Sequence, residues 1–319
     1  MRRSLLTSLL YLLCSLLCVI VLLSLTTAFA SAQTPGTATA AMRPYKGARA
    51  VVAVKVNGAG PYDFLVDTGA TATVLDAELF QQLGLRSEDS IAVHSAAGTE
   101  IRAASIVKEI ALDQLSVKDL RVLSVETLPF GPQYQGVRGI LGENFLQHFD
   151  VLIDNQHRKI TLDAGSSLAE SLGGERLPIT FIDGGEIKFR PTVSVTVPNY
   201  SSHPVKVLLD SGADTLLLVG SRTTQPATLA NAVRVKTVNG ALSCTSAENT
   251  LRWGKSTLSE LAITTCQSAT ANSRDYQGNL PTSIFQRIFI SHAGSYVIVE
   301  PSKHAPAPQE IAVVTPLAR

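Results

Sequence analysis

The chain has 319 residues, 45% of them hydrophobic, which is enough apolar material for a sizeable core and argues against disorder of the whole chain. Its 27 basic and 26 acidic residues are interspersed and leave a formal net charge of +1. Because no stripe of Lys and Arg offers a surface to a phosphate backbone, we expect no nucleic-acid partner.

The N-terminus departs from this even distribution of charged residues. Arg2 and Arg3 precede a long apolar run from Leu5 to Leu25, and small residues follow it up to Ala30-Ser31-Ala32. Charge, apolar stretch and small-x-small site in this order predict a secretory signal over residues 1–32. The run is also long enough to span a bilayer, so an uncleaved N-terminal membrane anchor is the alternative. Either way we expect an exported protein, whether secreted, periplasmic or on the cell surface.

Cysteine usage agrees with export. Cys14 and Cys18 lie inside the predicted signal, which leaves Cys244 and Cys266. In an oxidising compartment these two are expected to form one disulfide, with two unpaired thiols as the alternative. The His residues form no close pair on a helical face and have no Cys pair nearby, so we expect no metal site and no cofactor.

Residues 33–45 are rich in Thr, Ala and Pro without periodicity, so they predict a linker, and the folded part is expected to begin near Lys46. Beyond it, short runs rich in Val, Ile and Thr alternate with turn residues, as in Val51 to Val56 and Val205 to Leu209. Helical stretches are few, and Ala77 to Leu83 is a clear example. The fold class is therefore mainly β.

An internal repeat organises these strands. In Ala53 to Leu75, and again in Ser194 to Leu218, a β-patterned strand, a turn and a second apolar strand lead to Asp, a hydroxyl residue, Gly and Ala. Farther on, Gly139 to Asp154 resembles Gly278 to His292. The same landmarks in the same order indicate a duplicated unit.

Predicted hairpins follow both Asp motifs at matching distances. Gly98 lies 31 residues after Asp67, and Gly240 lies 30 residues after Asp210, where Asn239-Gly240 is a strong hairpin signal. The duplication therefore extends beyond the Asp motifs and predicts two lobes.

The two lobes are expected to be separated by a segment containing Gly and Ser and followed by a Pro-rich tail. The predicted segments are the signal 1–32, a linker 33–45, an N-terminal lobe 46–165, a linker 166–178, a C-terminal lobe 179–300 and a tail 301–319.

Each Asp comes directly after an apolar run, where a buried strand would break into a turn. Gly69 and Gly212 permit a tight turn whose backbone N–H groups can point back at the carboxylate. Two lobes packed about an approximate two-fold axis would bring Asp67 and Asp210 together, and like charges at contact distance share one proton. The ionised carboxylate then takes a proton from a held water, while the protonated one donates to a substrate carbonyl oxygen. The pattern therefore predicts amide hydrolysis without a covalent intermediate.

Three motifs, Asp67-Thr68-Gly69-Ala70, Asp210-Ser211-Gly212-Ala213 and Gly139-Ile140-Leu141-Gly142, resemble those of aspartic peptidases of the pepsin and retropepsin clan. The resemblance covers nearly all of residues 46–300. It implies a bilobal acid-protease fold made of two retropepsin-like β-barrel lobes related by a pseudo-two-fold. It also implies an aspartic-type endopeptidase with Asp67 and Asp210 as the catalytic pair.

The resemblance assigns roles to the neighbouring residues as well. The Thr68 and Ser211 hydroxyls would brace the dyad through mutual hydrogen bonds, and the hairpins at Gly98 and Gly240 would act as flaps. Ile140-Leu141-Gly142 would pack behind the first Asp loop. The sequence departs from the pattern in two ways: the second unit reads Asn279-Leu280-Pro281 at this point, and neither hairpin has the Tyr that pepsin-like enzymes place over the substrate.

The expected partner is a polypeptide substrate, and the expected contact with a membrane is limited to an uncleaved N-terminal segment. We expect a monomer. One alternative is a catalytically weak or inactive peptide-binding protein with the same two lobes. The other is a homodimeric peptidase in which each unit pairs with its twin in a second chain.

Overall fold

The structure is a computed structural model that describes residues 36–45, 49–95, 98–128, 130, 132–184, 187–220, 231–237, 240–266 and 275–301. The strands of this part lie in one compact unit that begins at Thr37. The predicted signal, with Cys14 and Cys18, lies outside the described residues, as do residues 302–319 of the predicted tail. Within these ranges, no helix is long and apolar enough to cross a membrane.

A seven-stranded sheet forms the lobe that carries Asp67, the N-terminal lobe. Its strand order is β2-β3-β8-β4-β7-β6-β5, and a further pairing of β2 with β6 closes it on itself. The strands are β2 (Val51–Val56), β3 (Ala59–Val66), β4 (Thr73–Asp76), β5 (Asp89–Ser95), β6 (Gly98–Leu112), β7 (Leu115–Val125) and β8 (Gly139–Leu141). Alternating buried and exposed residues in β2 and β7 account for one face packing on the core.

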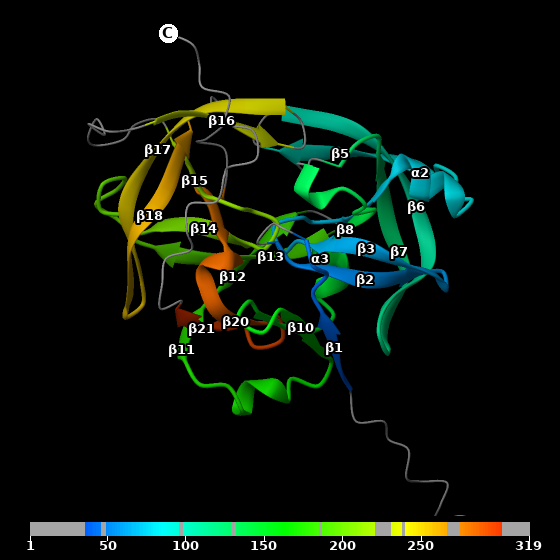
Figure 1. Ribbon diagram of the computed structural model, residues 1–319, viewed down its shortest axis with the longest axis horizontal. Helices are drawn as coiled ribbons and strands as arrows, with labels where there is room; N and C mark the ends of the chain where they lie inside the picture. The colour runs from blue at the N-terminus through cyan, green and yellow to red at the C-terminus, as the bar shows by residue number, and fades with distance from the viewer. Residues whose placement is uncertain are drawn as a thin grey trace, which may run out of the picture. The chain divides into compact units, whose positions relative to one another are not determined.

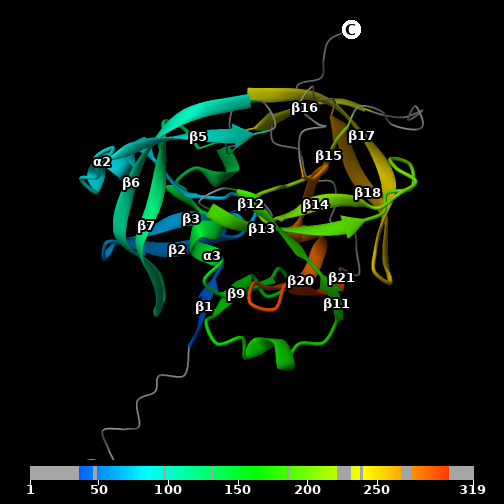
Figure 2. The same ribbon diagram turned by 180° about the vertical axis from the view of Figure 1, so that it is seen from behind.

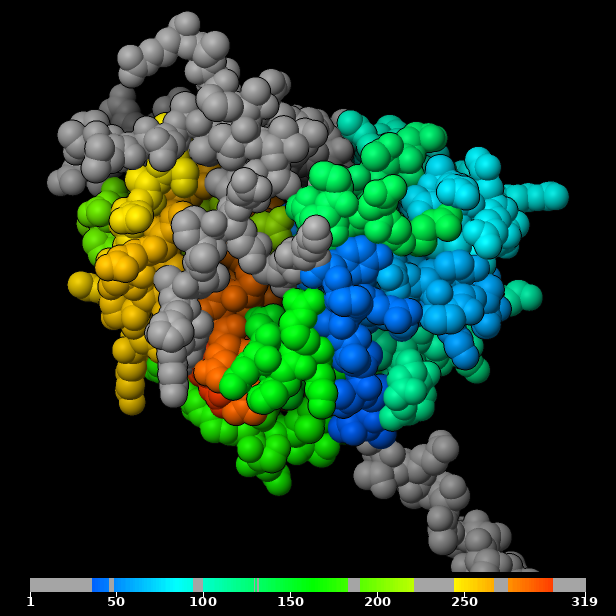
Figure 3. All heavy atoms as spheres, in the orientation of Figure 1, coloured from blue at the N-terminus to red at the C-terminus, as the bar shows by residue number. Residues whose placement is uncertain are grey.

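An eight-stranded sheet forms the C-terminal lobe, in the order β12-β13-β14-β19-β15-β18-β17-β16. The strands are β12 (Thr180–Gly184), β13 (Ile187–Val195), β14 (Val205–Asp210), β15 (Leu216–Val219), β16 (Asn231–Thr237), β17 (Gly240–Trp253), β18 (Ser256–Cys266) and β19 (Gly278–Pro281). After β12, this order repeats that of the N-terminal sheet strand for strand. The two lobes lie on opposite sides in Figure 1, and Figure 3 shows the same division on the surface.

A third sheet takes three strands from each half of the chain and lies below both lobes (Figures 1 and 2). Its order is β1-β10-β9-β20-β21-β11, and β9 and β20 pair antiparallel at its centre, with Ile153 opposite Ile288. The strands are β1 (Thr37–Ala41), β9 (Asp150–Asp154), β10 (Lys159–Asp163), β11 (Glu175–Pro178), β20 (Phe285–Ser291) and β21 (Tyr296–Pro301). The fold class predicted from the sequence, mainly β and bilobal, is confirmed.

The structure differs from the sequence-based expectation in both linkers. Strand β1 lies inside predicted linker 33–45 and pairs with β10, with Ala38 fully buried. Strand β11 and the short helix η2 (Leu168–Glu170) lie inside predicted linker 166–178. Short Thr- and Ala-rich segments carry too little apolar pattern to reveal an edge strand, whose pairing depends on a neighbour far along the chain.

In the described part of the chain, two short α-helices interrupt the strands, α2 (Ala77–Gln82) and α3 (Glu143–Leu146). Asp76 caps α2 by accepting a hydrogen bond from the backbone N–H of Leu79 at 2.6 Å. The helix α3 follows directly on β8, so it lies behind the loop that carries Asp67.

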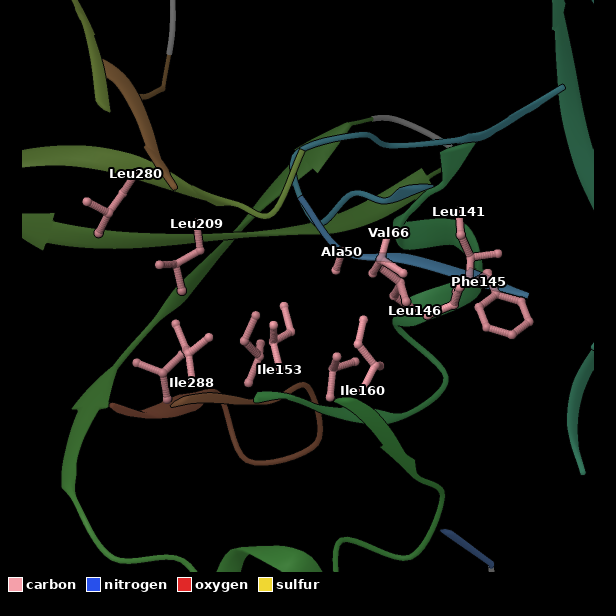
Figure 4. Close-up of a cluster of buried hydrophobic side chains, with 14 of the residues drawn as sticks. Ala50, Val66, Leu141, Phe145, Leu146, Ile153, Ile160, Leu209, Leu280 and Ile288 are labelled. Carbon is pink, nitrogen blue, oxygen red and sulfur yellow. The ribbon is translucent and has the colours of Figure 1, made fainter. Parts of the chain in front are cut away.

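The core runs continuously from the third sheet into both lobes. Figure 4 shows Ile153 and Ile288 on the third sheet pointing toward Val66 and Leu209, the residues that precede the two Asp. All four are at most 1% exposed. Burying an aliphatic side chain of this size stabilises a fold by about 1.5–3 kcal/mol. Packing on the third sheet thus holds the ends of β3 and β14 in fixed positions relative to each other.

The predicted disulfide is confirmed. Cys244 on β17 lies directly opposite Cys266 on β18, with a Cα–Cα distance of 4.2 Å, and the two sulfurs are bonded. The bond joins neighbouring strands of the C-terminal lobe.

Candidate active site

Asp67 and Asp210 lie at equivalent strand ends in the two lobes. Asp67 follows the last residue of β3, and Asp210 is the last residue of β14. Each strand has a parallel neighbour on one side, β8 beside β3 and β19 beside β14. The backbone N–H of Asp67 donates to Leu141 O at 3.0 Å. Strand β8, the support strand of this lobe, therefore also holds the start of the loop that carries Asp67.

The backbone after each Asp turns back toward its carboxylate, as the sequence predicts. Oδ1 of Asp67 accepts hydrogen bonds from the N–H groups of Gly69 at 2.8 Å and Ala70 at 3.0 Å. Oδ1 of Asp210 accepts one from Gly212 N–H at 2.9 Å. Such donors stabilise a buried carboxylate that would otherwise be costly to desolvate.

The two glycines are required for a reason that the sequence alone does not give. A Cβ added to Gly69 would lie 2.6 Å from Cγ of Asp210, and one added to Gly212 would overlap the Asp67 carboxylate. Each loop therefore approaches the carboxylate of the opposite lobe too closely for any side chain. The same contacts place the two Asp side by side.

Thr68 and Ser211 join the two loops through a reciprocal set of buried hydrogen bonds. The N–H of Thr68 donates to Ser211 Oγ at 3.0 Å, and the N–H of Ser211 donates to Thr68 Oγ1 at 3.1 Å. The Thr68 hydroxyl donates to Leu209 O and the Ser211 hydroxyl to Val66 O, each at 2.7 Å. Each hydroxyl thus bonds the backbone of the other lobe rather than the other hydroxyl.

Burial and mutual repulsion shape the electrostatics of the pair. Desolvation raises the pKa of Asp67, opposed by the Gly69 N–H and the Arg49 guanidinium. Desolvation, and then the Asp67 charge, raise the pKa of Asp210 to about 8. At neutral pH the pair therefore keeps a shared proton, the state required for one carboxyl to act as acid and the other as base.

Arg49 and Asp214 form an ion pair between the lobes that we did not predict. Arg49 Nη2 lies 2.7 Å from Asp214 Oδ2, and both side chains are largely buried. The guanidinium also lies over the rings of Phe130 and Tyr134, 5.6 and 5.3 Å from their centroids. The one available signal was the position of Asp214 directly after the second Asp-Ser-Gly-Ala motif. Arg49 is the cation that lowers the pKa of both dyad residues.

A buried Glu–His contact between the two halves of the chain lies behind the Asp67 loop. Glu143 Oε2 is 2.9 Å from His292 Nε2, and His292 Nδ1 contacts Phe149 O at 2.7 Å. The N–H of Glu143 donates to Ala70 O at 2.8 Å. Sequence reasoning did not single out His292, because its partner lies in the other half of the chain.

The altered motif in the second lobe keeps the same support. Leu280 pairs with Leu209 on β14, as Leu141 pairs with Val66 on β3. Pro281 occupies the position of Gly142, where a Cβ would lie 2.5 Å from Ala72 O. The N-terminal lobe therefore needs glycine at this point, whereas the C-terminal lobe accommodates a ring.

Gly98 and Gly240 each begin the second strand of a hairpin. Ser95 pairs with Gly98, and Thr237 pairs with Gly240, while residues 96–97 and 238–239 lie outside the described residues. In Figures 1 and 2 these hairpins approach each other from the two lobes, on the side opposite the third sheet. Over the described ranges, no cluster of three or more His, Cys, Asp or Glu is arranged to hold a metal ion.

Comparison with known proteins agrees with this geometry. Residues 52–145, which include Asp67 and its support strand, match the family model described as aspartyl protease. The aspartic proteinase from Irpex lacteus is similar in structure, with a TM-score of 0.54 and 13% identity over 87% of this chain and 100% of that one. The chain therefore has the fold of an aspartic proteinase, and the family match covers the part of it that carries Asp67.

A shorter protein of known structure also matches part of the chain. The retropepsin-like aspartic protease from Rickettsia conorii has 20% identity and a TM-score of 0.30, covering 40% of this chain and 90% of that one. No curated protein matches the sequence.

Proposed function

We propose that this chain is an exported aspartic endopeptidase that hydrolyses polypeptides through a water held by Asp67 and Asp210. The observation that carries the proposal is the close approach of two carboxylates, buried Asp210 and half-buried Asp67, each lying against the loop of the other lobe. Like charges so placed share one proton. Thr68, Ser211 and the loop N–H groups then act as the dyad support, and the hairpins at Gly98 and Gly240 as flaps.

The chemistry follows from the two protonation states. The ionised carboxylate takes a proton from the water as the water oxygen attacks the carbonyl carbon, while the protonated carboxyl donates its proton to the carbonyl oxygen. When the tetrahedral intermediate collapses, the C–N bond breaks, the amine nitrogen gains a proton, and the dyad returns to its singly protonated state. Each step conserves the protons of the pair and the water, and no bond to the enzyme forms.

Export rests on two features of the sequence and the fold. The N-terminal order of charge, apolar run and small residues is typical of a secretory signal. A disulfide between Cys244 and Cys266 is typical of an oxidising compartment. We propose that the lobes correspond to residues 46–165 and 179–300.

A peptide-library digest tests the proposed activity. We expect the wild-type chain to cleave internal peptide bonds, and Asp67→Asn and Asp210→Asn each to reduce cleavage by roughly a thousandfold or more, because each removes one half of the acid–base pair. The matched control is Asp113→Asn, the same substitution at an exposed turn residue. Full cleavage by either dyad variant would show that the proposed mechanism is wrong.

A further inference from the structure

One side chain breaks the symmetry of the dyad. Asn279 on β19 pairs with Leu208, just as Ile140 on β8 pairs with Leu65 in the N-terminal lobe. The repeat therefore places an amide in the C-terminal lobe where the N-terminal lobe has an aliphatic side chain. In each lobe the strand partner of this position is the residue two before the Asp.

The amide contacts the carboxylate directly. Asn279 Nδ2 donates a hydrogen bond to Oδ2 of Asp210, while Oδ1 of the same group accepts from Gly212 N–H. In Asp67 both N–H donors, from Gly69 and Ala70, go to Oδ1. Backbone and amide N–H donors of the described residues thus reach both carboxylate oxygens of Asp210 but only Oδ1 of Asp67.

We propose that Asn279 is a positioning residue of the dyad, whose amide fixes the Asp210 carboxyl and favours its ionised form. The inference rests on the proposed function. An amide N–H donates more strongly to a carboxylate than to a carboxylic acid, and an amide does not itself titrate. The amide therefore stays a neutral donor across the working pH range, whereas a second ionisable group would change its own charge.

The charged surroundings of Asp210 show why such a donor matters. Asp67, on the loop after β3, faces it and raises its pKa, while Arg49, which precedes β2, lowers it. Arg49 is itself paired with Asp214. Asn279 acts in the same direction as Arg49, so it opposes the rise in the pKa of Asp210 that burial and the Asp67 charge cause.

Replacing Asn279 by Ile, the residue of the N-terminal lobe, tests this role through the pH profile of kcat/KM. Loss of the donor raises the pKa of Asp210, the carboxyl that keeps the shared proton, so the basic limb of the profile is expected to move to higher pH by about one unit. Asn279→Gln keeps an amide and is expected to move the profile less. Ile140→Val, the matched change in the other lobe, is expected to leave the position of both limbs unaltered. An Asn279→Ile profile lowered by the same factor at every pH would overturn the proposal.

A second measurement does not depend on turnover or on the folding of Asn279 variants. In the wild-type chain, the NMR signal of the Asn279 side-chain amide is expected to shift as the dyad titrates, and in Asp210→Asn that shift is expected to disappear. An amide signal that stays constant across the titration would overturn the proposed contact. A titrating signal in a chain that cleaves no peptide would instead contradict the proposed function and leave the contact intact.

Discussion

Asp210→Asn is expected to raise the melting temperature, by an amount that grows as the pH rises. Burial and the Asp67 charge raise the pKa of Asp210 from an ordinary 3.8 to about 8 in the folded chain. Between these values the folded state binds more protons than the unfolded state, so stability falls with rising pH. The amide is neutral and removes this cost. At about pH 8 we expect a gain of roughly 2 kcal/mol or more, or about 4–8 °C.

The pH dependence separates this effect from a general change in packing. At about pH 4 the carboxyl is protonated in the folded chain, so the difference between variant and wild type is expected to be small. Asp113→Asn, on the exposed turn between β6 and β7, serves as the control and is expected to show no growing difference. Thermal unfolding followed across the pH range measures both. A constant or shrinking difference between Asp210→Asn and wild type would contradict the electrostatic account.

Thr68→Val is expected to destabilise the chain and reduce turnover together. The substitution keeps the shape of a fully buried side chain but removes the donor to Leu209 O and the acceptor for Ser211 N–H. Leaving buried backbone groups unpaired costs about 1–3 kcal/mol each. Because these bonds also join the two Asp loops, we expect kcat to fall by roughly tenfold to a hundredfold. Urea unfolding and steady-state kinetics measure the two effects.

Thr68→Ser is the matched control, because it keeps the hydroxyl and removes one methyl group. It is expected to retain most of the stability and turnover that Thr68→Val loses. If Thr68→Ser were damaged as severely as Thr68→Val, packing of the methyl group rather than hydrogen bonding would hold the loops together.

The sequence predicts best the features that depend on local pattern and on the repeat. The two hairpins whose second strands begin at Gly98 and Gly240 follow from turn chemistry, which acts over a few residues. The repeat predicts that the two lobes share one plan, and the strand orders of the two sheets agree with it. The predicted roles of Asp67 and Asp210 stay proposals until activity is measured.

The features that the sequence does not reveal are contacts between distant segments. Arg49 and Asp214 are far apart in the chain, and neither type of residue indicates a partner. Asn279 reads in the sequence as a departure from an apolar motif, yet it contacts the Asp210 carboxylate. Strand β1 is recognised by its pairing with β10 and not by its composition. In each case the interaction is set by the packing of the lobes, which no local pattern encodes.

The central claim is that one chain supplies both halves of the dyad, and an equimolar mixture of Asp67→Asn and Asp210→Asn tests it most directly. If Asp67 and Asp210 of the same chain form the site, every molecule in the mixture lacks one carboxyl, and kcat/KM is expected to remain as low as that of either variant alone. If each unit instead pairs with its twin in a second chain, each variant alone keeps one intact pair and substantial activity, and if unlike units of two chains pair, intact Asp67–Asp210 pairs form in the mixture. Recovery of a substantial fraction of wild-type kcat/KM would contradict the account.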